Sequence, residues 1–376
     1  MSIFSFRSPT SAIGLDIGTT SIRGVEVALN HEPPILTKLG VIKISPDIVK
    51  EGEIAYSKGV SAALRELWNQ AGFSKKNIIL GVANQKVVLR LIDLPFMDEA
   101  ELQGAIKFQA QDFIPMPVED VIIDFEIQQE YEAKEGERMI KVLLVAAQKE
   151  MINGFVNALG GAGLTPKAID VKSFALVRSL IPKISPVLTE EQAESVSQTI
   201  CILDIDAAIT NMIIAERDLP YFVRILLFGG DELTKPLADS FKISMEEAEE
   251  LKIGLSEPEP EGGSEEIIEL KDRRNKARSI LEPKISSFVR EIRRSIDFCL
   301  DQTGCSAPER IILSGRGGSL PILSSDLEKI LQIKVEFGKP LQNVKIGNLR
   351  ISQEELIKME PSLAVATGLA LREAER

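Results

Sequence analysis

Two segments of the chain share one pattern, and this repetition constrains the fold more than any other feature of the sequence. Residues 12–29, AIGLDIGTTSIRGVEVAL, read as a strand, a turn with Asp16 and Gly18, and a second strand. Residues 199–216, TICILDIDAAITNMIIAE, repeat this order, with Asp204 lying 188 residues after Asp16. An internal duplication of this kind predicts two lobes of similar architecture.

The length and composition agree with a folded protein of about two domains. A chain of 376 residues exceeds one typical core, and 44% hydrophobic with 27% charged residues is ordinary for a globular protein. The net charge of −12 argues against nucleic acid as a partner, because neutralising phosphates requires clustered Lys and Arg. With His31 as the only histidine, a zinc site, a Ser-His-Asp triad and a Cys-His pair are excluded.

The sequence also predicts a cytoplasmic protein. Cys201, Cys299 and Cys305 are odd in number and have apolar neighbours, which is typical of a reducing compartment. Apolar runs such as VLLVAA at 142–147 are far shorter than the roughly 20 residues of a membrane helix, and no signal peptide precedes the first strand. The N-terminal stretch MSIFSFR is read either as a weak membrane-touching tip or as a frayed end.

Helical and strand-like segments alternate along the chain, which predicts an α/β fold. Apolar residues at helical spacing predict an amphipathic helix over 57–71 and another over about 98–113, ended by the prolines of IPMP. Together with the strands VIIDFEIQ and MIKVLLVAAQ, the second helix indicates a compact α+β unit inserted in the first lobe. A flexible acidic loop is expected at 255–266, and residues 285–300 have the pattern of a long helix.

The first turn has residues that suit a phosphate. Asp16, at the end of a strand, can hold a hydrated Mg²⁺, and Gly18 lets the backbone approach a phosphate closely. The hydroxyls and amides of Thr19, Thr20 and Ser21 add hydrogen-bond donors. On its own this motif is also typical of an ordinary hairpin turn, in which Asp and Gly supply the turn chemistry.

A glycine-rich turn near the C-terminus is the third element of the pattern. In ILSGRGG at 312–318, Gly315, Gly317 and Gly318 follow an apolar strand and precede a helix. A flat purine and its ribose require such a close backbone, although the same turn alone would suit the start of any helix. The three elements in this order favour nucleotide binding, and the absence of Walker A and G-x-G-x-x-G motifs excludes P-loop and Rossmann sites.

These motifs resemble those of the actin, heat-shock 70 and sugar-kinase superfamily, whose members clamp ATP and Mg²⁺ between two ribonuclease-H-like lobes. The first phosphate motif corresponds to LDIGTTS at 15–21, the second to LDIDAAIT at 203–210, and the adenosine motif to LSGRGG at 313–318. The resemblance implies an actin-like α/β fold with two ribonuclease-H-like lobes, a nucleotide cleft and an inserted α+β subdomain in the first lobe.

Within this superfamily the chain is more closely similar to the PilM family of type IV pilus assembly. The stretches that carry this resemblance are FQAQDFIPMPVEDVIIDF at 108–125, GGDELTKPLADSFKISMEEAEELK at 229–252, EIRRSIDFCL at 291–300 and AVATGLALR at 364–372. It implies an ATP-binding cytoplasmic scaffold, peripheral to the inner membrane through its partners. The implied partners are the N-terminal cytoplasmic segment of PilN, held in a groove involving the inserted subdomain, and other platform proteins; self-association is left open.

The resemblance also suggests how the chain divides. A first lobe of residues 1–195 would carry the inserted subdomain at about 77–165. A second lobe of residues 196–376 would carry a helical subdomain at about 229–280, and a final helix at 362–374 would pack back at the lobe interface.

By matching positions, Asp16 and Asp204 would organise Mg²⁺ and are the candidate catalytic residues. The residues implied to bind the nucleotide are Gly18, Thr19, Thr20, Ser21, Asp206, Thr210, Gly229, Gly230, Glu249, Lys252, Gly315, Gly317 and Gly318. Of these, Glu249 and Lys252 would reach the ribose and base, or form an i, i+3 surface ion pair instead.

Two residues depart from the superfamily pattern. Asp206 stands where the second phosphate motif usually has glycine, and Arg316 replaces a small residue in the adenosine turn. A carboxylate beside the triphosphate favours slow hydrolysis, or binding alone, over vigorous turnover. Two alternative functions are a small-molecule kinase of the same superfamily and a division anchor like FtsA. The FtsA family ends in a linker and a membrane helix, whereas this chain ends at LREAER.

Overall fold

The structure is a computed structural model that describes residues 11–133, 136–181, 199–216, 219–258, 261–262, 264–303 and 305–372. The N-terminal MSIFSFR and the expected boundary between the lobes at residue 195 lie outside these ranges.

A six-stranded sheet forms the centre of the first lobe. Its strand order is β10-β6-β1-β2-β3-β16, with β1 antiparallel to β2 and parallel to β6. The strands are β1 (Ser11–Ile17), β2 (Ser21–Ala28), β3 (Ile35–Lys43), β6 (Asn77–Val82), β10 (Thr165–Val171) and β16 (Lys345–Ile346). Helices α1 (Ser57–Ala71) and α3 (Lys149–Gly161) share one core with Ile13, Leu15 and Ile17 of β1. The short ribbon β4 (Val49–Lys50) and β5 (Glu53–Ile54) lies beside α3.

The second lobe repeats this arrangement around a five-stranded sheet of order β13-β12-β11-β14-β15. As in the first lobe, a strand pairs antiparallel with its hairpin partner and parallel with the next strand, here β11 with β12 and β14. The strands are β11 (Thr199–Ile205), β12 (Thr210–Glu216), β13 (Leu219–Leu226), β14 (Arg310–Ser314) and β15 (Lys334–Phe337). The predicted actin-like fold with two similar lobes is therefore confirmed.

Two short helices join the lobes. Helices α4 (Lys172–Leu180) and α11 (Ala364–Leu371) pack on each other, and α11 also covers β1 and β2. Residues of both helices share one buried core with Ile79 of the first sheet and Ile202 and Ile312 of the second. The C-terminal segment thus crosses back to the first lobe, where β16 pairs with β3 and α10 (Gln353–Met359) follows. The expected assignment of all residues after 196 to the second lobe is corrected by this return.

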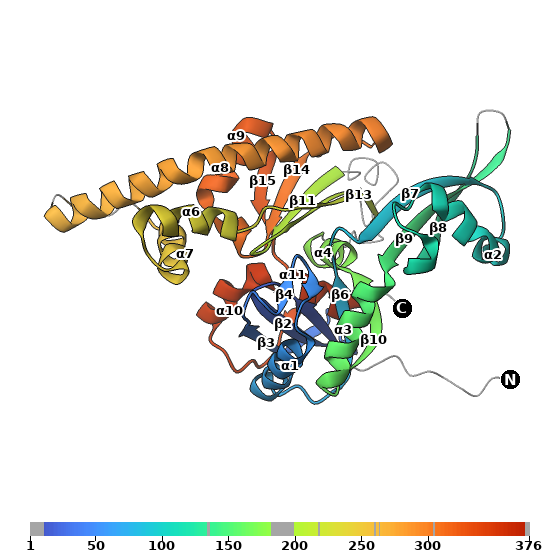
Figure 1. Ribbon diagram of the computed structural model, residues 1–376, viewed down its shortest axis with the longest axis horizontal. Helices are drawn as coiled ribbons and strands as arrows, with labels where there is room; N and C mark the ends of the chain where they lie inside the picture. The colour runs from blue at the N-terminus through green and yellow to red at the C-terminus, as the bar shows by residue number, and fades with distance from the viewer. Residues whose placement is uncertain are drawn as a thin grey trace.

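The inserted subdomain is smaller than predicted. It comprises a three-stranded sheet of order β7-β9-β8 and helix α2 (Glu99–Gln109), and it projects to the right in Figure 1. Its strands are β7 (Val87–Pro95), β8 (Val121–Glu132) and β9 (Arg138–Gln148). The predicted range of 77–165 also took in β6 and α3, but β6 hydrogen-bonds to β1 and α3 packs on α1. Those two elements therefore belong to the main sheet of the first lobe.

The helical subdomain consists of α6 (Asp231–Phe241), α7 (Met245–Gly254) and the first part of α8 (Glu265–Thr303). Helix α8 is continuous for 39 residues and runs from this subdomain along the second lobe (Figure 1). Its apolar residues, among them Ile285, Phe288 and Ile292, are buried beside β11 and β14 together with α9 (Pro321–Leu331). The predicted limit at residue 280 is therefore wrong, because no break separates the subdomain from the lobe. Among the described helices, none has both the length and the hydropathy that crossing a membrane requires.

Candidate functional site

The turn of the first-lobe hairpin faces the turn of the second-lobe hairpin where the two lobes meet. In each turn the first amide donates to the carbonyl three residues later, from Gly18 to Ser21 and from Asp206 to Ile209, both at 3.0 Å. Gly18 and Asp206 thus hold equivalent positions. A Cβ atom on Gly18 would lie 2.6 Å from Oδ2 of Asp206, so the carboxylate of the second turn lies directly against the first turn.

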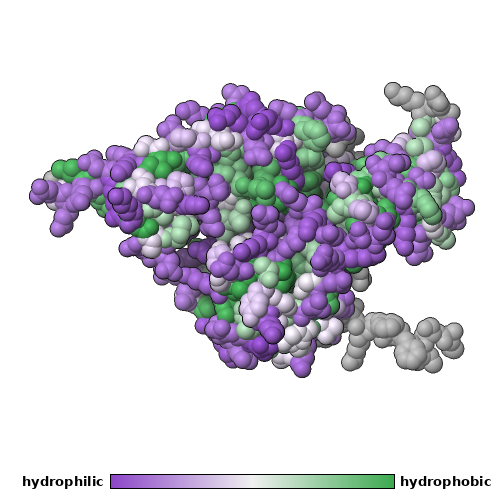
Figure 2. All heavy atoms as spheres, viewed as in Figure 1, coloured by the Kyte–Doolittle hydropathy of each residue, from purple (hydrophilic) through white to green (hydrophobic). Residues whose placement is uncertain are grey.

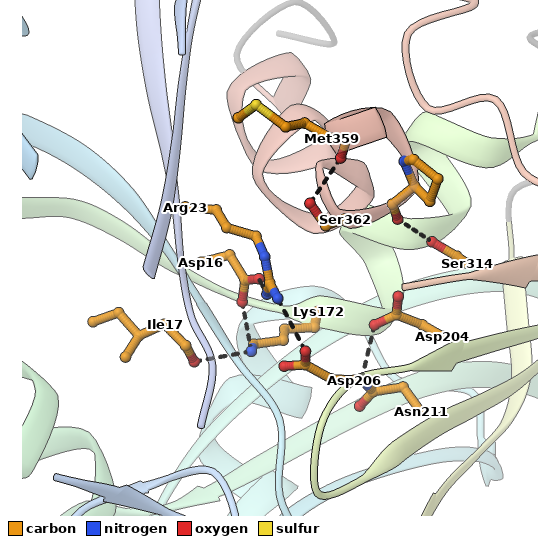
Figure 3. Close-up of polar contacts among 11 residues, drawn as sticks. Asp16, Ile17, Arg23, Lys172, Asp204, Asp206, Asn211, Ser314, Met359 and Ser362 are labelled. Atoms are coloured by element: carbon orange, nitrogen blue, oxygen red, sulfur yellow. Dashed lines mark hydrogen bonds and ion pairs between the residues drawn. The ribbon is translucent and has the colours of Figure 1, made fainter. Parts of the chain in front are cut away.

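A buried ionic network joins these turns (Figure 3). Arg23 on β2 places Nη1 2.8 Å from Oδ2 of Asp16 and Nη2 3.0 Å from Oδ1 of Asp206. Lys172, the first residue of α4, places Nζ 2.6 Å from Oδ1 of Asp16 and donates to the Ile17 carbonyl at 3.1 Å. Asp16, Arg23 and Lys172 are all more than nine-tenths buried, so their charges are screened little by water. The carboxylate of Asp16 is therefore held by two cations.

The two aspartates of the second turn have opposite pKa shifts. Burial raises the pKa of Asp204 to about 6, and the nearby charges of Asp206 and Asp16 add to the effect. Its hydrogen-bond donor is neutral, since Asn211 Nδ2 donates to Oδ2 at 3.2 Å. Burial also disfavours the charge of Asp206, but Arg23 and Lys172 outweigh it and lower the pKa of this carboxyl. Arg23, although desolvated, has a raised pKa because Asp206 and Asp16 stabilise its charge.

The ion pairs of Asp16 oppose its direct coordination of Mg²⁺ in this arrangement. Mg²⁺ requires near-octahedral oxygen ligands at about 2.0–2.1 Å. Both oxygens of Asp16 already face Arg23 and Lys172, whose charges would repel a second cation. Across the described residues, no group of three or more His, Cys, Asp or Glu is placed to hold a metal ion. Asp16 therefore anchors two basic side chains in this arrangement, and the expectation that Asp16 and Asp204 organise Mg²⁺ through its waters stays a prediction.

The predicted glycines meet behind the second turn. The amide of Gly230 donates to the Asp206 carbonyl at 2.9 Å, and a Cβ atom on Gly230 would lie 3.8 Å from Cα of Gly317. Gly315 has φ of +77°, and a Cβ there would lie 2.3 Å from the Ile205 carbonyl. Gly229 is equally close to the Ala207 carbonyl, and the Gly318 amide donates to the Gly315 carbonyl at 3.3 Å. The start of α6 and the glycine-rich turn at 315–318 therefore pack directly against the end of β11.

Lys252 lies beneath this group. Its Nζ is 2.6 Å from Oε2 of Glu249, and it donates to Thr234 Oγ1 at 2.7 Å and to the Gly230 carbonyl at 3.1 Å. The ion pair that the sequence suggested is present, but Lys252 is only 2% exposed, so it is not a surface pair. Burial opposes ionisation of Glu249, yet Lys252 and Thr234 lower its pKa. Arg316 is exposed, and its charge also favours the ionised Glu249.

The hydroxyl residues of the phosphate motifs differ in their availability. Ser21 Oγ is buried without a hydrogen-bond partner, and Thr19 is also buried. The carbonyl of Thr20 accepts from the Ile44 amide at 2.9 Å, which ties the turn to the chain after β3. Thr210 differs from the expectation, because its hydroxyl donates to the Phe228 carbonyl at 2.6 Å and its single proton is already used.

The sequence did not indicate Arg23 or Lys172, although both contact Asp16. A signal for Arg23 existed: in a hairpin with this turn, residues 16 and 23 are cross-strand partners. The same register pairs Asp204 with Asn211. No pattern in the sequence indicated Lys172, because α4 approaches Asp16 only through the packing of the first lobe.

Figure 2 shows the surface hollowed between the α6–α7 pair and the first lobe, with hydrophilic residues in the hollow. The two turns, the ionic network and the glycines around Gly230 come from different parts of the chain and meet between the lobes. Backbone amides, hydroxyls and basic side chains in such a place can bind a phosphorylated ligand.

Comparisons with known proteins agree with this architecture. The solved structure of a PilM-PilN type IV pilus biogenesis complex matches with a TM-score of 0.80 and 30% identity, covering 98% of this chain and 100% of that one. MreB 5 of Spiroplasma citri bound to AMPPNP matches with a TM-score of 0.50 and 11% identity over 96% and 95% of the two chains, which shows a shared fold.

Two sequence comparisons cover most of the chain. Cell division protein FtsA of Streptococcus pneumoniae serotype 2 (strain D39 / NCTC 7466) is 23% identical over 359 residues, which span 88% of this chain and 75% of FtsA. The family model described as type IV pilus assembly protein PilM matches residues 14–374. With an actin-like fold and a family match over nearly its whole length, the chain belongs to the PilM family of type IV pilus assembly proteins.

Proposed function

We propose that this protein is an ATP-binding, actin-like scaffold of the type IV pilus inner-membrane platform, and that it binds the N-terminal cytoplasmic segment of PilN. In this role it lies at the cytoplasmic face of the inner membrane, held there by its partner. Membership of the PilM family favours a scaffold over a small-molecule kinase or a division anchor. In this proposal the protein acts through its conformation: the angle between the lobes determines how well other platform proteins fit its surface.

The observation that carries nucleotide binding is the meeting of two equivalent turns from two lobes. The basic side chains of Arg23 and Lys172 flank the first turn, which also carries the buried, unpartnered hydroxyl of Ser21. Glycines pack closely behind the second turn. A triphosphate between the turns would receive charge from Arg23 and Lys172 and a hydrogen bond from Ser21. The adenosine would lie toward Gly230 and Gly317, above the buried Lys252.

Nucleotide binding can be tested with one matched pair of variants. Calorimetric titration with ATP is expected to give saturable binding, and Ser21→Ala to weaken it about five-fold, as for one lost hydrogen bond. Ser325→Ala removes the hydroxyl of an exposed serine on α9 and should change nothing. Absence of ATP binding by the unaltered protein would refute the nucleotide part of the proposal, whereas equal loss in both variants would remove Ser21 from the site.

A cavity beside the inserted subdomain supports PilN binding. It has a volume of about 700 Å³ and lies between the first lobe and the inserted subdomain. Its walls come from β5, from the start of α3 and from the inserted subdomain near Asp120, and the Glu53–Lys86 ion pair lies on one side at 2.8 Å. Polar walls of this kind suit an extended segment, whose backbone amides and carbonyls need partners. The resemblance to the chain in the PilM-PilN complex supports PilN as the partner in this proposal.

Filling this cavity tests the PilN proposal. Asn153 on α3 lines it and is exposed, so Asn153→Trp should weaken binding of a PilN N-terminal peptide at least ten-fold in a fluorescence anisotropy titration. Asn69→Trp makes the same change at an exposed position of α1 outside the cavity and is the control. Unchanged binding in Asn153→Trp would move the peptide to another surface, and no binding by the unaltered protein would refute the partner.

A further inference from the structure

The ion pair between Arg23 and Asp206 joins residues 183 positions apart in sequence and belongs to both lobes. Arg23 lies on β2 of the first sheet, and Asp206 lies in the turn after β11 of the second. The two terminal nitrogens of Arg23 bind different carboxylates, Nη1 that of Asp16 at 2.8 Å and Nη2 that of Asp206 at 3.0 Å. The Nε atom of Arg23 is buried and has no hydrogen-bond partner. This guanidinium therefore has an unused hydrogen-bond donor for an anion between the two turns.

The carboxylate of Asp206 occupies the gap between the turns. Its Oδ2 atom would lie 2.6 Å from a Cβ on Gly18, and Oδ1 contacts Arg23. The backbone hydrogen bond of the turn does not depend on this side chain, because Gly18 makes the same bond at 3.0 Å, although the Asp206 carboxylate also accepts from the Ala207 amide. Carboxylates and phosphates are both oxyanions that bind guanidinium groups with the same geometry. The carboxylate of Asp206 thus lies at the position where a phosphate bound between the two turns would lie.

Resting on the proposed nucleotide binding, we propose that Asp206 is a built-in competitor of the nucleotide, and that its carboxylate holds on Arg23 the position that a nucleotide phosphate takes. When the nucleotide binds, the phosphate replaces Asp206 at Nη2 and reaches the free Nε. Asp16 keeps its contact with Nη1, so Arg23 stays in position throughout the exchange. No bond is made or broken in this step.

The exchange changes how the lobes are connected. With Asp206 on Arg23, the lobes are joined directly by a buried ion pair. With a phosphate in its place, that link is replaced by contacts from both turns to one ligand. A ligand shifts a conformational equilibrium only by its difference in affinity for the two states. The competition between Asp206 and phosphate provides such a difference, because only one of them can occupy Nη2.

The test compares ATP affinity, by calorimetry, in single and double variants. Asp206→Asn removes the competing charge and keeps the size of the side chain, and we expect it to tighten ATP binding at least five-fold. Asp206→Gly restores the residue of the equivalent position and should act in the same direction. Arg23→Gln should weaken binding at least ten-fold. Adding Asp206→Asn to Arg23→Gln should then have less than a two-fold effect, because the competition takes place on Arg23.

A buried arginine elsewhere provides the control for lost stability. Arg274 on α8 is 6% exposed and pairs with Glu257 at 2.8 Å, so Arg274→Gln removes a comparable side chain outside the cleft and should leave ATP affinity unchanged. Weaker or unchanged binding in both Asp206 variants would overturn the proposal. So would a five-fold gain that persists without Arg23, since it would reflect general charge repulsion. Failure of the unaltered protein to bind ATP would refute the proposed nucleotide function itself.

Discussion

The two hairpins share backbone geometry and differ in charge. Asp16 faces Arg23 across the first hairpin, and Asp204 faces Asn211 at the same register in the second. One aspartate is therefore held by cations, while the other has a neutral partner and a pKa raised to about 6 by burial. The first turn then has glycine where the second has Asp206. In this duplicated fold, the cations Arg23 and Lys172 thus come from the first lobe and the anion Asp206 comes from the second. Arg23 and Asp206 meet between the lobes.

This asymmetry matters more for function than the symmetry does. If both hairpins had kept a glycine in the turn, no side chain would link the lobes at this point. The Arg23–Asp206 pair makes the closed contact between the lobes depend on charge, and charge is what a nucleotide brings. Three tests address the comparison, in order of decreasing effect.

Removing the shared cation should have the largest effect. Arg23→Gln leaves Asp16 with Lys172 alone and Asp206 without its partner, and breaking a buried charge network by removing one member costs about 3–5 kcal/mol. We expect a loss of this size in the free energy of unfolding, measured by urea denaturation followed by circular dichroism. A loss below about 1 kcal/mol would mean that water enters the cleft and solvates both carboxylates, contrary to the burial described here.

The two aspartates of the second turn should respond oppositely to pH. Asp204 holds its proton more tightly in the folded than in the unfolded state, so it lowers stability as the pH rises from about 4 to about 6, by on the order of 2–3 kcal/mol in total. Asp204→Asn should therefore be more stable than the unaltered protein above pH 6 and no more stable at pH 4. Asp206 has a lowered pKa, so its stabilisation is present above pH 4 and is lost on further acidification.

The matched variant for that measurement is Asp206→Asn, which should be less stable than the unaltered protein at pH 7. Urea denaturation at pH 4, 5, 6 and 7 gives both differences in one series. If the two variants shifted stability in the same direction at pH 7, the electrostatic distinction between the two positions would be wrong.

Metal removal should have the smallest effect. Because Arg23 and Lys172 already occupy the oxygens of Asp16, ATP affinity should differ less than ten-fold between buffers with Mg²⁺ and with EDTA, a difference of less than about 1.4 kcal/mol. The measurement is the same calorimetric titration in each buffer. A hundred-fold loss in EDTA would contradict this expectation and show that the metal takes part in nucleotide binding, as the superfamily pattern had suggested.

Much of the fold could be predicted from local patterns. The helix at 57–71 and both hairpins are as expected, because periodic apolar residues and turn residues act over a few positions. The limits of the inserted subdomain could not be found this way. The segments at 77–82 and 149–161 fit either a separate unit or the main sheet, and only strand pairing and packing against α1 assign them.

The site was predictable to the same degree. The glycines and turn residues could be identified by their type and spacing. The structure brings Gly18, Gly230 and Gly317 to one region. The hydrogen bond of Thr210 could not be predicted, because its hydroxyl donates to a carbonyl 18 residues away. Lys172 was missed for a similar reason, since it reaches Asp16 from a helix 155 residues beyond the carbonyl to which it donates.

By itself the sequence determined the two repeated hairpins, the α/β class and the family resemblance, because these depend on residue type and spacing along the chain. Only the tertiary structure decided which charges neutralise one another. In the sequence, Asp206 is only an acidic residue at a position where glycine is usual. In the folded protein the two lobes bring it into contact with Arg23, 183 residues away. Electrostatic pairing depends on distance in space and on the exclusion of water, and neither quantity exists before the chain has folded.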